Sequence, residues 1–436
     1  MPMYDLGIVN GHLYVDGSWV EGNLYIKDGK IAVISEGFEE AAEEYDCGGK
    51  IVLPGFIDPH VHLSMDAYPY KTVDSFYTGT VAAAFGGVTT IIDFLDSAYS
   101  EADIEKLYNE RMGLAQKSVI DYSFHAAIAT LKGSVRAAAV NALDLGMPTI
   151  KIYTTYKEQG WNTPDRITDE LLSLSKEYGL RILAHAENDD MLLKSDEIPV
   201  SMHETARPVS AETSEVVKLA EIAEYRNGDL YIVHVSSGNT VESLKKKYNK
   251  MLGSSLILES CPHYFTFSSD VYRESDGYLY TMTPPLRCTS EVEALRRNIS
   301  YINTIATDHC SFRKINKCQS NINKIPMGVG GIEYSFQIMY NMFGNVVIDK
   351  FTKNTAMAHG LFPRKGILLP GADADVVIFD PLADCVLYEN HSACDYSIYN
   401  NARVKGQVVS TVSRGRFVVR DRVFCGGQGA YIKRKL

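Results

Sequence analysis

The chain has 436 residues, of which 45% are hydrophobic and 22% charged, so a large barrel with additions or two domains is expected. Its formal net charge of -11 argues against nucleic acid or an anionic membrane as the main partner. No apolar run is long enough to span a bilayer, the first residues show no secretory signal, and the eight scattered cysteines favour reduced thiols in a cytoplasmic protein.

Both ends of the chain are rich in short β segments, in which Gly and Asp separate apolar patches. These segments are residues 8–9, 11–15 and 22–26 near the start, and 374–379, 408–412 and 415–419 near the end. Two β-rich ends around a different middle predict one small β-sandwich domain, built jointly from residues 1–50 and 365–436.

The middle of the chain, residues 51–364, alternates short apolar runs with helical stretches. The predicted strands are residues 51–57, 88–92, 120–124, 149–153, 181–184, 230–233, 255–258 and 304–307. Each run alone would also suit a buried helix, but their regular spacing of about thirty residues is what a (β/α)8 TIM barrel needs. The predicted fold class is therefore α/β.

Residues suited to metal binding follow the predicted strands, at the end where barrel enzymes place their catalytic groups. They are His60, His62, Lys151, His185, His234 and Asp308. Residues two apart on a strand end point the same way, so His60 and His62 are expected to share one metal. A single strand-end histidine is more often a packing residue, and the recurrence on separate strands favours a site.

The nitrogen and oxygen donors of this set suit zinc or a similar divalent ion. Six ligands are too many for one catalytic ion, whereas two ions about 3.5–4 Å apart would use them. Lys151 is the unusual member, because an ammonium only donates hydrogen bonds. It becomes a ligand as a carbamate, formed when its neutral amine adds carbon dioxide. The alternative for Lys151 is a strand-end salt bridge.

Motifs along nearly the whole chain resemble the metal-dependent cyclic amidohydrolases, and most closely their dihydropyrimidinase and hydantoinase branch. The matching segments are residues 54–63, 82–90, 151–157, 185–188, 234–236, 283–287, 307–310, 360–366 and 371–375. The resemblance implies that His60, His62, carboxylated Lys151 and Asp308 surround one metal. It implies that Lys151, His185 and His234 hold the second, with Zn2+ as the expected ion.

The same resemblance implies a reaction. A hydroxide bridging the two metals opens a hydantoin or dihydropyrimidine ring to an N-carbamoyl amino acid. Asp308 carries the proton to the leaving nitrogen, and Tyr156 donates a hydrogen bond to the oxyanion. Tyr156, Thr283 and Met327 are the expected ring contacts. For Tyr156, the alternative is a half-buried loop tyrosine without a catalytic role.

Other branches of the family share the metal ligands, so ring-opening of the allantoinase or dihydroorotase kind is the alternative activity. Dihydroorotases have an arginine that pairs with the substrate carboxylate, and Ser64 stands at that position. The Pro-Gly-Arg run of allantoinases is also absent. Two residues depart from the hydantoinase pattern, which has Ser in place of Thr283 and Asn in place of Met327. These departures put the ring specificity in doubt more than the chemistry.

Two loops, about residues 64–72 and 153–163, are expected to surround the ring substituent. Their large side chains are Met65, Tyr68, Tyr70, Tyr153 and Trp161. They suit an apolar or aryl substituent, or alternatively a subunit interface. The resemblance implies a homotetramer or homodimer. An alternative of another class, a non-catalytic dihydropyrimidinase-related interaction protein, is disfavoured because such relatives lose metal ligands and this chain keeps all six.

Overall fold

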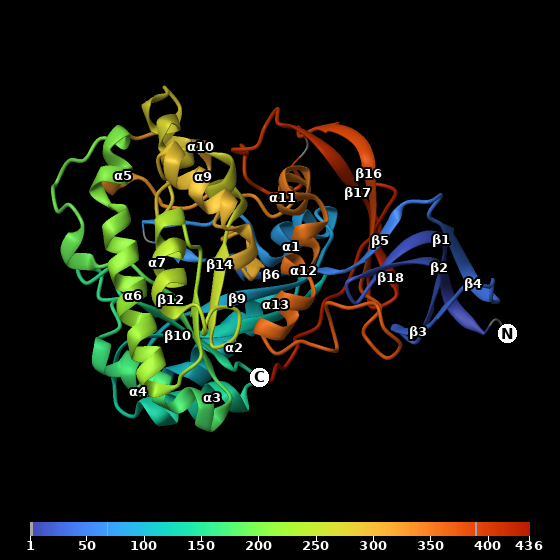
Figure 1. Cartoon of the computed structure of the whole chain (residues 1–436), viewed down its shortest axis with the longest axis horizontal. Coiled ribbons are helices and arrows are strands. Elements are labelled where there is room, and N and C mark those ends of the chain that lie inside the picture. The colour runs from blue at the N-terminus through green and yellow to red at the C-terminus, as the bar shows by residue number, and fades with distance from the viewer. Residues whose placement is uncertain (1–2, 68, 389) are drawn as a thin grey trace.

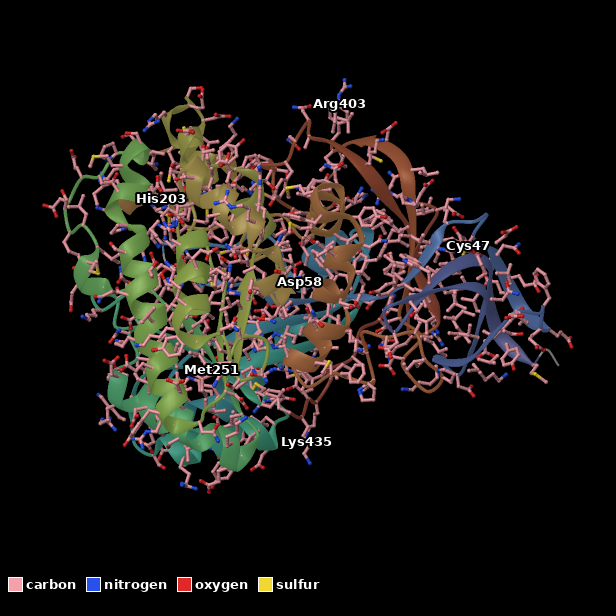
Figure 2. All side chains as sticks on the ribbon, in the orientation of Figure 1. Cys47, Asp58, His203, Met251, Arg403 and Lys435 are labelled. Carbon is pink, nitrogen blue, oxygen red and sulfur yellow. The ribbon has the colours of Figure 1, made fainter. Side chains whose placement is uncertain are left out.

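The computed structural model of the chain describes residues 3–67, 69–388 and 390–436. Figure 1 shows a barrel of strands wrapped by helices on the left and a sheet-rich part on the right, where the N-terminus lies. Figure 2 shows Cys47 within that sheet-rich part and Asp58 deep in the interior of the molecule. The α/β fold class predicted from the sequence is confirmed.

Within the described residues, the barrel consists of eight neighbouring strands that all run parallel. In spatial order they are β15 (Thr304–Ile305), β14 (Leu256–Ser260), β13 (Leu230–Ile232), β12 (Arg181–His185), β11 (Thr149–Tyr153), β10 (Asp121–Lys132), β9 (Val88–Ser100) and β6 (Phe56–Val61). The barrel closes where Val61 bridges His309, just beyond β15. Asp58 strengthens this closure by accepting hydrogen bonds from the backbone and hydroxyl of Thr307.

Helices alternate with these strands and form the outer layer, as a βα repeat requires. The main helices are α1 (Phe76–Phe85), α2 (Asp103–Ala115), α3 (Val135–Asp144), α4 (Asp165–Tyr178), α6 (Val209–Arg226), α7 (Gly238–Tyr248), α9 (Thr289–Arg297) and α11 (Ser335–Phe343). Short helices follow α11, namely α12 (Ile348–Phe351) and α13 (Lys353–Ala358). None of the helices among the described residues is long and apolar enough to cross a membrane.

Capping residues explain where several helices begin. Ser75 forms a capping box with Thr78 at the start of α1. Ser237 accepts from the backbone of Thr240 at the start of α7, three residues after His234. The chain therefore turns into a helix immediately after this strand end, which leaves His234 facing the rim of the barrel.

The second sheet is mixed and is built from both ends of the chain. Its strands are β1 (Tyr4–Val15), β2 (Ser18–Lys27), β3 (Lys30–Ser35), β4 (Ala41–Asp46), β5 (Ile51–Pro54), β16 (Val376–Val386), β17 (Arg403–Ser413), β18 (Arg416–Arg420) and β19 (Val423–Phe424). β5 lies between β1 and β16 and so joins the two ends. The sheet has its own apolar cluster, which includes Ile8, Val52, Ile378 and Val412.

The structure corrects the first predicted barrel strand, residues 51–57. Residues 51–54 belong to the second sheet, and the barrel strand begins at Phe56. The break falls at Gly55, where an added Cβ would lie 2.2 Å from the hydroxyl oxygen of Thr89. Only glycine fits where the chain passes from one sheet to the other, so an apolar run that looks continuous serves two sheets.

The C-terminal tail also leaves the second sheet and returns to the barrel. Tyr431 bridges Tyr122 at the start of β10, and the buried Arg434 donates to Ser123 and Thr149. The tail thus packs against the amino ends of barrel strands, although its sequence adjoins the β-rich terminal segment.

Candidate active site

One cavity of about 1310 Å3 lies at the carboxyl ends of the barrel strands. Its lining includes every residue that the sequence singled out, namely His60, His62, Lys151, Tyr156, His185, His234, Thr283, Asp308 and Met327. Residues separated by up to 267 positions in the chain therefore meet at the end of the barrel where such enzymes work.

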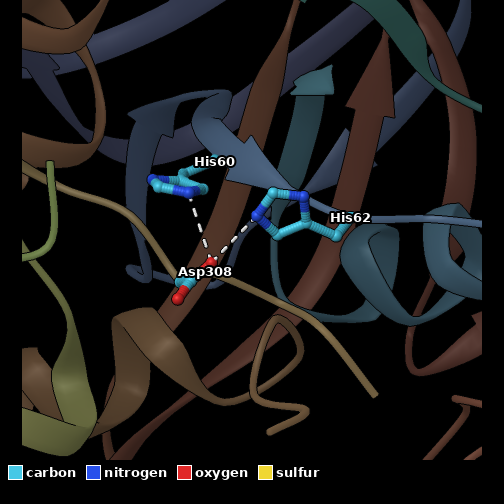
Figure 3. Close-up of side chains that lie close together, drawn as sticks. All are labelled: His60, His62 and Asp308. Atoms are coloured by element: carbon cyan, nitrogen blue, oxygen red, sulfur yellow. Dashed lines mark ion pairs between the residues drawn. The ribbon is translucent and has the colours of Figure 1, made fainter. Parts of the chain in front are cut away.

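His60, His62 and Asp308 form the most compact group in the cavity. The Nε2 atoms of the two histidines lie 3.2 and 3.1 Å from the same Asp308 carboxylate oxygen. Figure 3 shows both imidazole rings pointing at this carboxylate from one strand end. Their donor atoms lie within 4.8 Å of one another, which is the geometry of a metal site with mixed nitrogen and oxygen ligands.

The remaining predicted ligands lie on the neighbouring side. The ring centroids of His185 and His234 are 4.6 Å apart, and that of His234 is 5.4 Å from His60. Lys151 is buried, and its Nζ lies 5.2 Å from the ring centroid of Phe94. Phe94 also packs against His60, with centroids 4.7 Å apart, so one phenyl ring supports ligands from two strands.

Two buried carboxylates orient the histidines from behind. Glu259 accepts from His60 Nδ1 at 2.8 Å, and Glu187 accepts from His185 Nε2 at 2.6 Å. Each contact fixes the tautomer and leaves the other ring nitrogen with its lone pair: Nε2 of His60 and Nδ1 of His185. The sequence alone does not distinguish these two nitrogens.

Burial disfavours the charged form of three of these imidazoles. Burial lowers the pKa of His62 and His185, and it lowers the pKa of His234 well below the ordinary value. Burial alone would raise the pKa of Asp308, but the nearby His60 and the hydrogen bond from His62 hold it well below its usual range. The group therefore combines an ionised carboxylate with imidazoles of His62, His185 and His234 that burial disfavours in the charged form, a donor set that suits a divalent cation.

Burial also lowers the pKa of Lys151 to about 8, against the opposing effect of Glu259 and Asp308. A lysine of this kind has far more neutral amine near neutral pH than an exposed one. Because the neutral amine is the form that adds carbon dioxide, the environment of Lys151 suits carbamate formation. Among the described residues, no salt bridge involves the Lys151 Nζ, which disfavours the alternative of a strand-end salt bridge for Lys151.

Backbone strain marks the same positions. His234, Asp308 and Tyr156 have φ angles of 40°, 48° and 67°, in the left-handed region that residues other than glycine rarely occupy. Such conformations persist where the surrounding structure imposes them, and they cluster at functional sites. Here they turn the side chains from three different strand ends into the cavity.

Tyr156 and Thr283 meet across the cavity, with their hydroxyl oxygens 2.7 Å apart. Burial raises the pKa of Tyr156 to about 12, so its hydroxyl keeps its proton and remains a donor at neutral pH. Beneath this wall, Lys317 donates to the carbonyls of Thr281 and Gly328 at 2.7 and 2.6 Å. Lys317 thereby ties together the two loops that carry Thr283 and Met327.

The loops at the mouth partly follow the prediction. Met65, Tyr70, Tyr153 and Trp161 line the cavity, and Trp161 is 41% exposed. Tyr68 lies outside the described residues. The structure adds Leu192, Leu193, Ile198, Ile322 and Ile325 to the apolar lining.

The donor set fits divalent metal ions. Among the described residues, His234 Nδ1 is buried with no hydrogen-bond partner, a costly state that a metal would relieve. His60 and His185 line the same cavity, and His60 Nε2 lies 3.2 Å from the Asp308 carboxylate. An orphaned ligand atom beside an ionised carboxylate is expected where a cation completes the site.

Sequence reasoning missed four residues of the site: Glu187, Glu259, Arg207 and Lys317. Glu259 had a usable signal, because it is an acidic residue near the end of an otherwise apolar strand, β14. Arg207 stands in a loop and Lys317 ends the short helix α10 (Lys314–Lys317), so no regular spacing indicates that they line or support the cavity.

Comparison with known proteins identifies the family. The profile of the amidohydrolase family matches residues 51–418, most of the chain. This chain belongs to the amidohydrolase family. Enzymes of this family depend on metals, and His60, His62 and Asp308 provide a group that fits one.

Within the amidohydrolase family, the relatives similar to this chain include hydantoinases. A D-hydantoinase from Geobacillus stearothermophilus is 34% identical over 98% of this chain and 96% of its own length. A D-phenylhydantoinase from Escherichia coli O1:K1 is 32% identical over 90% of each chain. The crystal structure of D-hydantoinase from Bacillus sp. AR9 superimposes with a TM-score of 0.93 at 31% identity, covering 99% of both chains.

Proposed function

We propose that this protein is a hydantoinase, a hydrolase that opens the cyclic amide of a hydantoin or dihydropyrimidine ring to give an N-carbamoyl amino acid. The observation that carries the proposal is the convergence of all nine predicted site residues on one cavity of the barrel. The names of the full-length relatives support the same ring class.

The proposed metal centre holds two divalent ions, with Zn2+ as the expected metal. His60, His62 and Asp308 would hold one, His185 and His234 would hold the other, and Lys151 would contribute to both as a carbamate. When bound, such ions lower the pKa of water toward neutrality and polarise a carbonyl oxygen. The low pKa of Lys151 and the orphaned Nδ1 of His234 support this assignment.

The side chains of the cavity supply the remaining chemistry. Asp308 is ionised, so its carboxylate takes a proton from the attacking water and delivers it to the leaving ring nitrogen. Tyr156 keeps its hydroxyl proton and donates a hydrogen bond to the oxygen that becomes negatively charged as the carbonyl is attacked. The C–N bond then breaks, and the ring opens to a carboxylate and a carbamoyl group.

Ring recognition is assigned to the wall formed by Tyr156, Thr283 and Met327. The hydroxyl of Thr283 is already hydrogen-bonded to Tyr156, which fixes the orientation of both. The ring substituent is expected to point toward the apolar mouth around Met65, Tyr70 and Trp161.

A substrate panel tests the proposal. Purified protein is incubated with dihydrouracil, hydantoin, 5-phenylhydantoin, allantoin and dihydroorotate, and the ring-opened product is measured. We expect 5-phenylhydantoin to be opened fastest, because an aryl group suits the aromatic mouth. Faster opening of dihydrouracil would remove the aryl assignment. Turnover confined to allantoin or dihydroorotate would contradict the proposed ring class.

Further parts of the assignment concern the whole molecule. We assign residues 1–50 and 365–436 to a composite terminal domain and residues 51–364 to the catalytic barrel. A homotetramer or homodimer in the cytoplasm is proposed for the native protein. Light scattering of the purified protein measures the assembly, and a monomer would contradict it.

A further inference from the structure

An ion pair between the partly buried Arg207 and the buried Glu187 lies beside the cavity. Glu187 is fully buried on the loop that follows β12, two residues beyond His185. Its carboxylate accepts from His185 and also from Arg207, with the Arg207 Nε and Nη2 atoms at 3.0 and 2.6 Å. The two parallel hydrogen bonds hold the guanidinium in one plane.

This fixed guanidinium lies over Tyr156. The Arg207 Cζ atom is 5.5 Å from the centroid of the Tyr156 ring, within the range of a cation–π contact, and both residues line the cavity. The backbone carbonyl of Arg207 accepts from Arg287, which is fully buried at the end of the loop that carries Thr283. Arg207 thus contacts Tyr156 directly and its loop supports the partner hydroxyl.

The placement has a chemical consequence. A cation over the face of a phenol draws electron density from the ring, which strengthens the hydroxyl as a hydrogen-bond donor. The bidentate pair with Glu187 keeps the cation there and makes the contact a fixed part of the site. The stronger donation and the fixed cation affect the reaction only if the Tyr156 hydroxyl contacts the substrate.

We propose that Arg207, anchored by Glu187, is a positioning residue that orients and strengthens Tyr156 as the oxyanion donor. The proposal rests on the proposed ring-opening function and deepens it. Arg207 is a cation of the cavity that is not one of the proposed metal ligands. If Arg207 acts through Tyr156, its contribution to turnover disappears when the hydroxyl is removed.

A double-mutant cycle tests this dependence. The four proteins are the wild type, Arg207→Met, Tyr156→Phe and the double variant, assayed with 5-phenylhydantoin. We expect Arg207→Met to lower kcat about tenfold in the wild type, with a smaller change in KM, and less than about twofold in the Tyr156→Phe background. Equal losses in both backgrounds, or no loss in the wild type, would overturn the proposal.

Two further variants separate a specific role from general damage. Arg207→Lys keeps the cation and one contact to Glu187, so kcat is expected to recover to within about threefold of wild type. The matched control is Lys194→Met, which removes another cation of the cavity paired with Asp189 and Glu158. Its effect should be the same in both backgrounds. Failure of Lys to rescue, or coupling of Lys194 with Tyr156, would contradict the assignment.

Two readouts do not depend on turnover. Metal content measured by atomic emission should be equal in wild type and Arg207→Met, because Glu187 still holds His185. A parallel loss of metal and kcat would contradict action through Tyr156.

Urea unfolding of the same four proteins should give non-additive shifts of the midpoint, since the two side chains touch. Additive shifts would overturn the contact. An inactive wild type with non-additive unfolding would reject the proposed function and leave the contact established.

Discussion

Acidic side chains gather at both ends of the barrel. At the carboxyl end, Asp308 lies with His60 and His62, and at the amino end, Asp121 lies with Asp373 and Asp375. Both groups are close enough in space to hold an ion. They differ in which charges surround them.

The amino-end group already contains its cation. Lys365 is 1% exposed, and its Nζ lies 2.8, 3.1 and 2.6 Å from Asp121, Asp373 and Asp375. These carboxylates hold the pKa of Lys365 above its ordinary value, although burial alone would lower it. The carboxyl-end group instead places the imidazoles of His60 and His62 beside its carboxylate, and burial lowers the pKa of His62. Carboxylates that are neutralised by a buried lysine contribute to the stability of the fold. A carboxylate without such a cation is available to bind a metal.

The largest expected effect is at the carboxyl end. Asp308→Asn replaces the proposed proton carrier with an amide that accepts no proton, so turnover of 5-phenylhydantoin should fall by about 10⁴ or more. Steady-state kinetics and circular dichroism on the same sample give activity and folding together. Full activity in a folded Asp308→Asn protein would remove Asp308 from the mechanism.

Metal removal sharpens the contrast between the two groups. Purified protein should contain about two divalent ions per chain, and a chelator should abolish turnover until metal is restored. Asp373→Asn, which alters the amino-end group, should keep the same metal content and the same metal dependence. Loss of a bound ion in Asp373→Asn would mean that a metal binds at the amino end of the barrel, which contradicts the proposal.

The amino-end group is expected to act on stability. Lys365→Met leaves three buried carboxylates without their shared cation and should lower the free energy of unfolding by about 3–5 kcal/mol. The control is Lys353→Met, which removes an exposed pair with Asp16 and should cost about 0–1 kcal/mol. Urea denaturation measures both. The kcat of the folded Lys365→Met fraction should be that of wild type, and a selective loss of kcat would contradict a purely stabilising role.

The last expected effect is a pH dependence that distinguishes two buried lysines. Lys317 contacts two carbonyls, and burial lowers its pKa to about 7, whereas the three carboxylates raise the pKa of Lys365. Between pH 7 and the ordinary lysine value of 10.5, the unfolded chain binds one more proton at Lys317 than the folded chain. The wild type should therefore gain stability as pH rises through this window, by up to about 1.4 kcal/mol per pH unit.

Lys317→Met isolates this contribution, because the other buried lysines are unchanged in the variant. The difference in urea midpoint between wild type and Lys317→Met should shift in favour of wild type from pH 7 to pH 10. A difference that stays constant with pH would mean that Lys317 is charged in the folded protein.

The sequence by itself determined the barrel, the β-rich ends and the identity of the residues around the cavity. This was possible because a parallel strand buries a short apolar run and places the next polar residue at its carboxyl end. His185, His234 and Asp308 each follow such a run. Their recurrence is a local pattern that a single sequence displays without any knowledge of contacts.

Only the tertiary structure decided how these residues are held. Glu259 lies 199 positions from the His60 ring that it orients, and Arg207 reaches Tyr156 from an irregular loop. The split of residues 51–57 between two sheets at Gly55 likewise depends on Thr89, which approaches from another strand. Hydrogen bonds and close packing between distant segments produce no periodic pattern in the sequence. Sequence periodicity reports the local helix or strand of each partner and not the contact between the two.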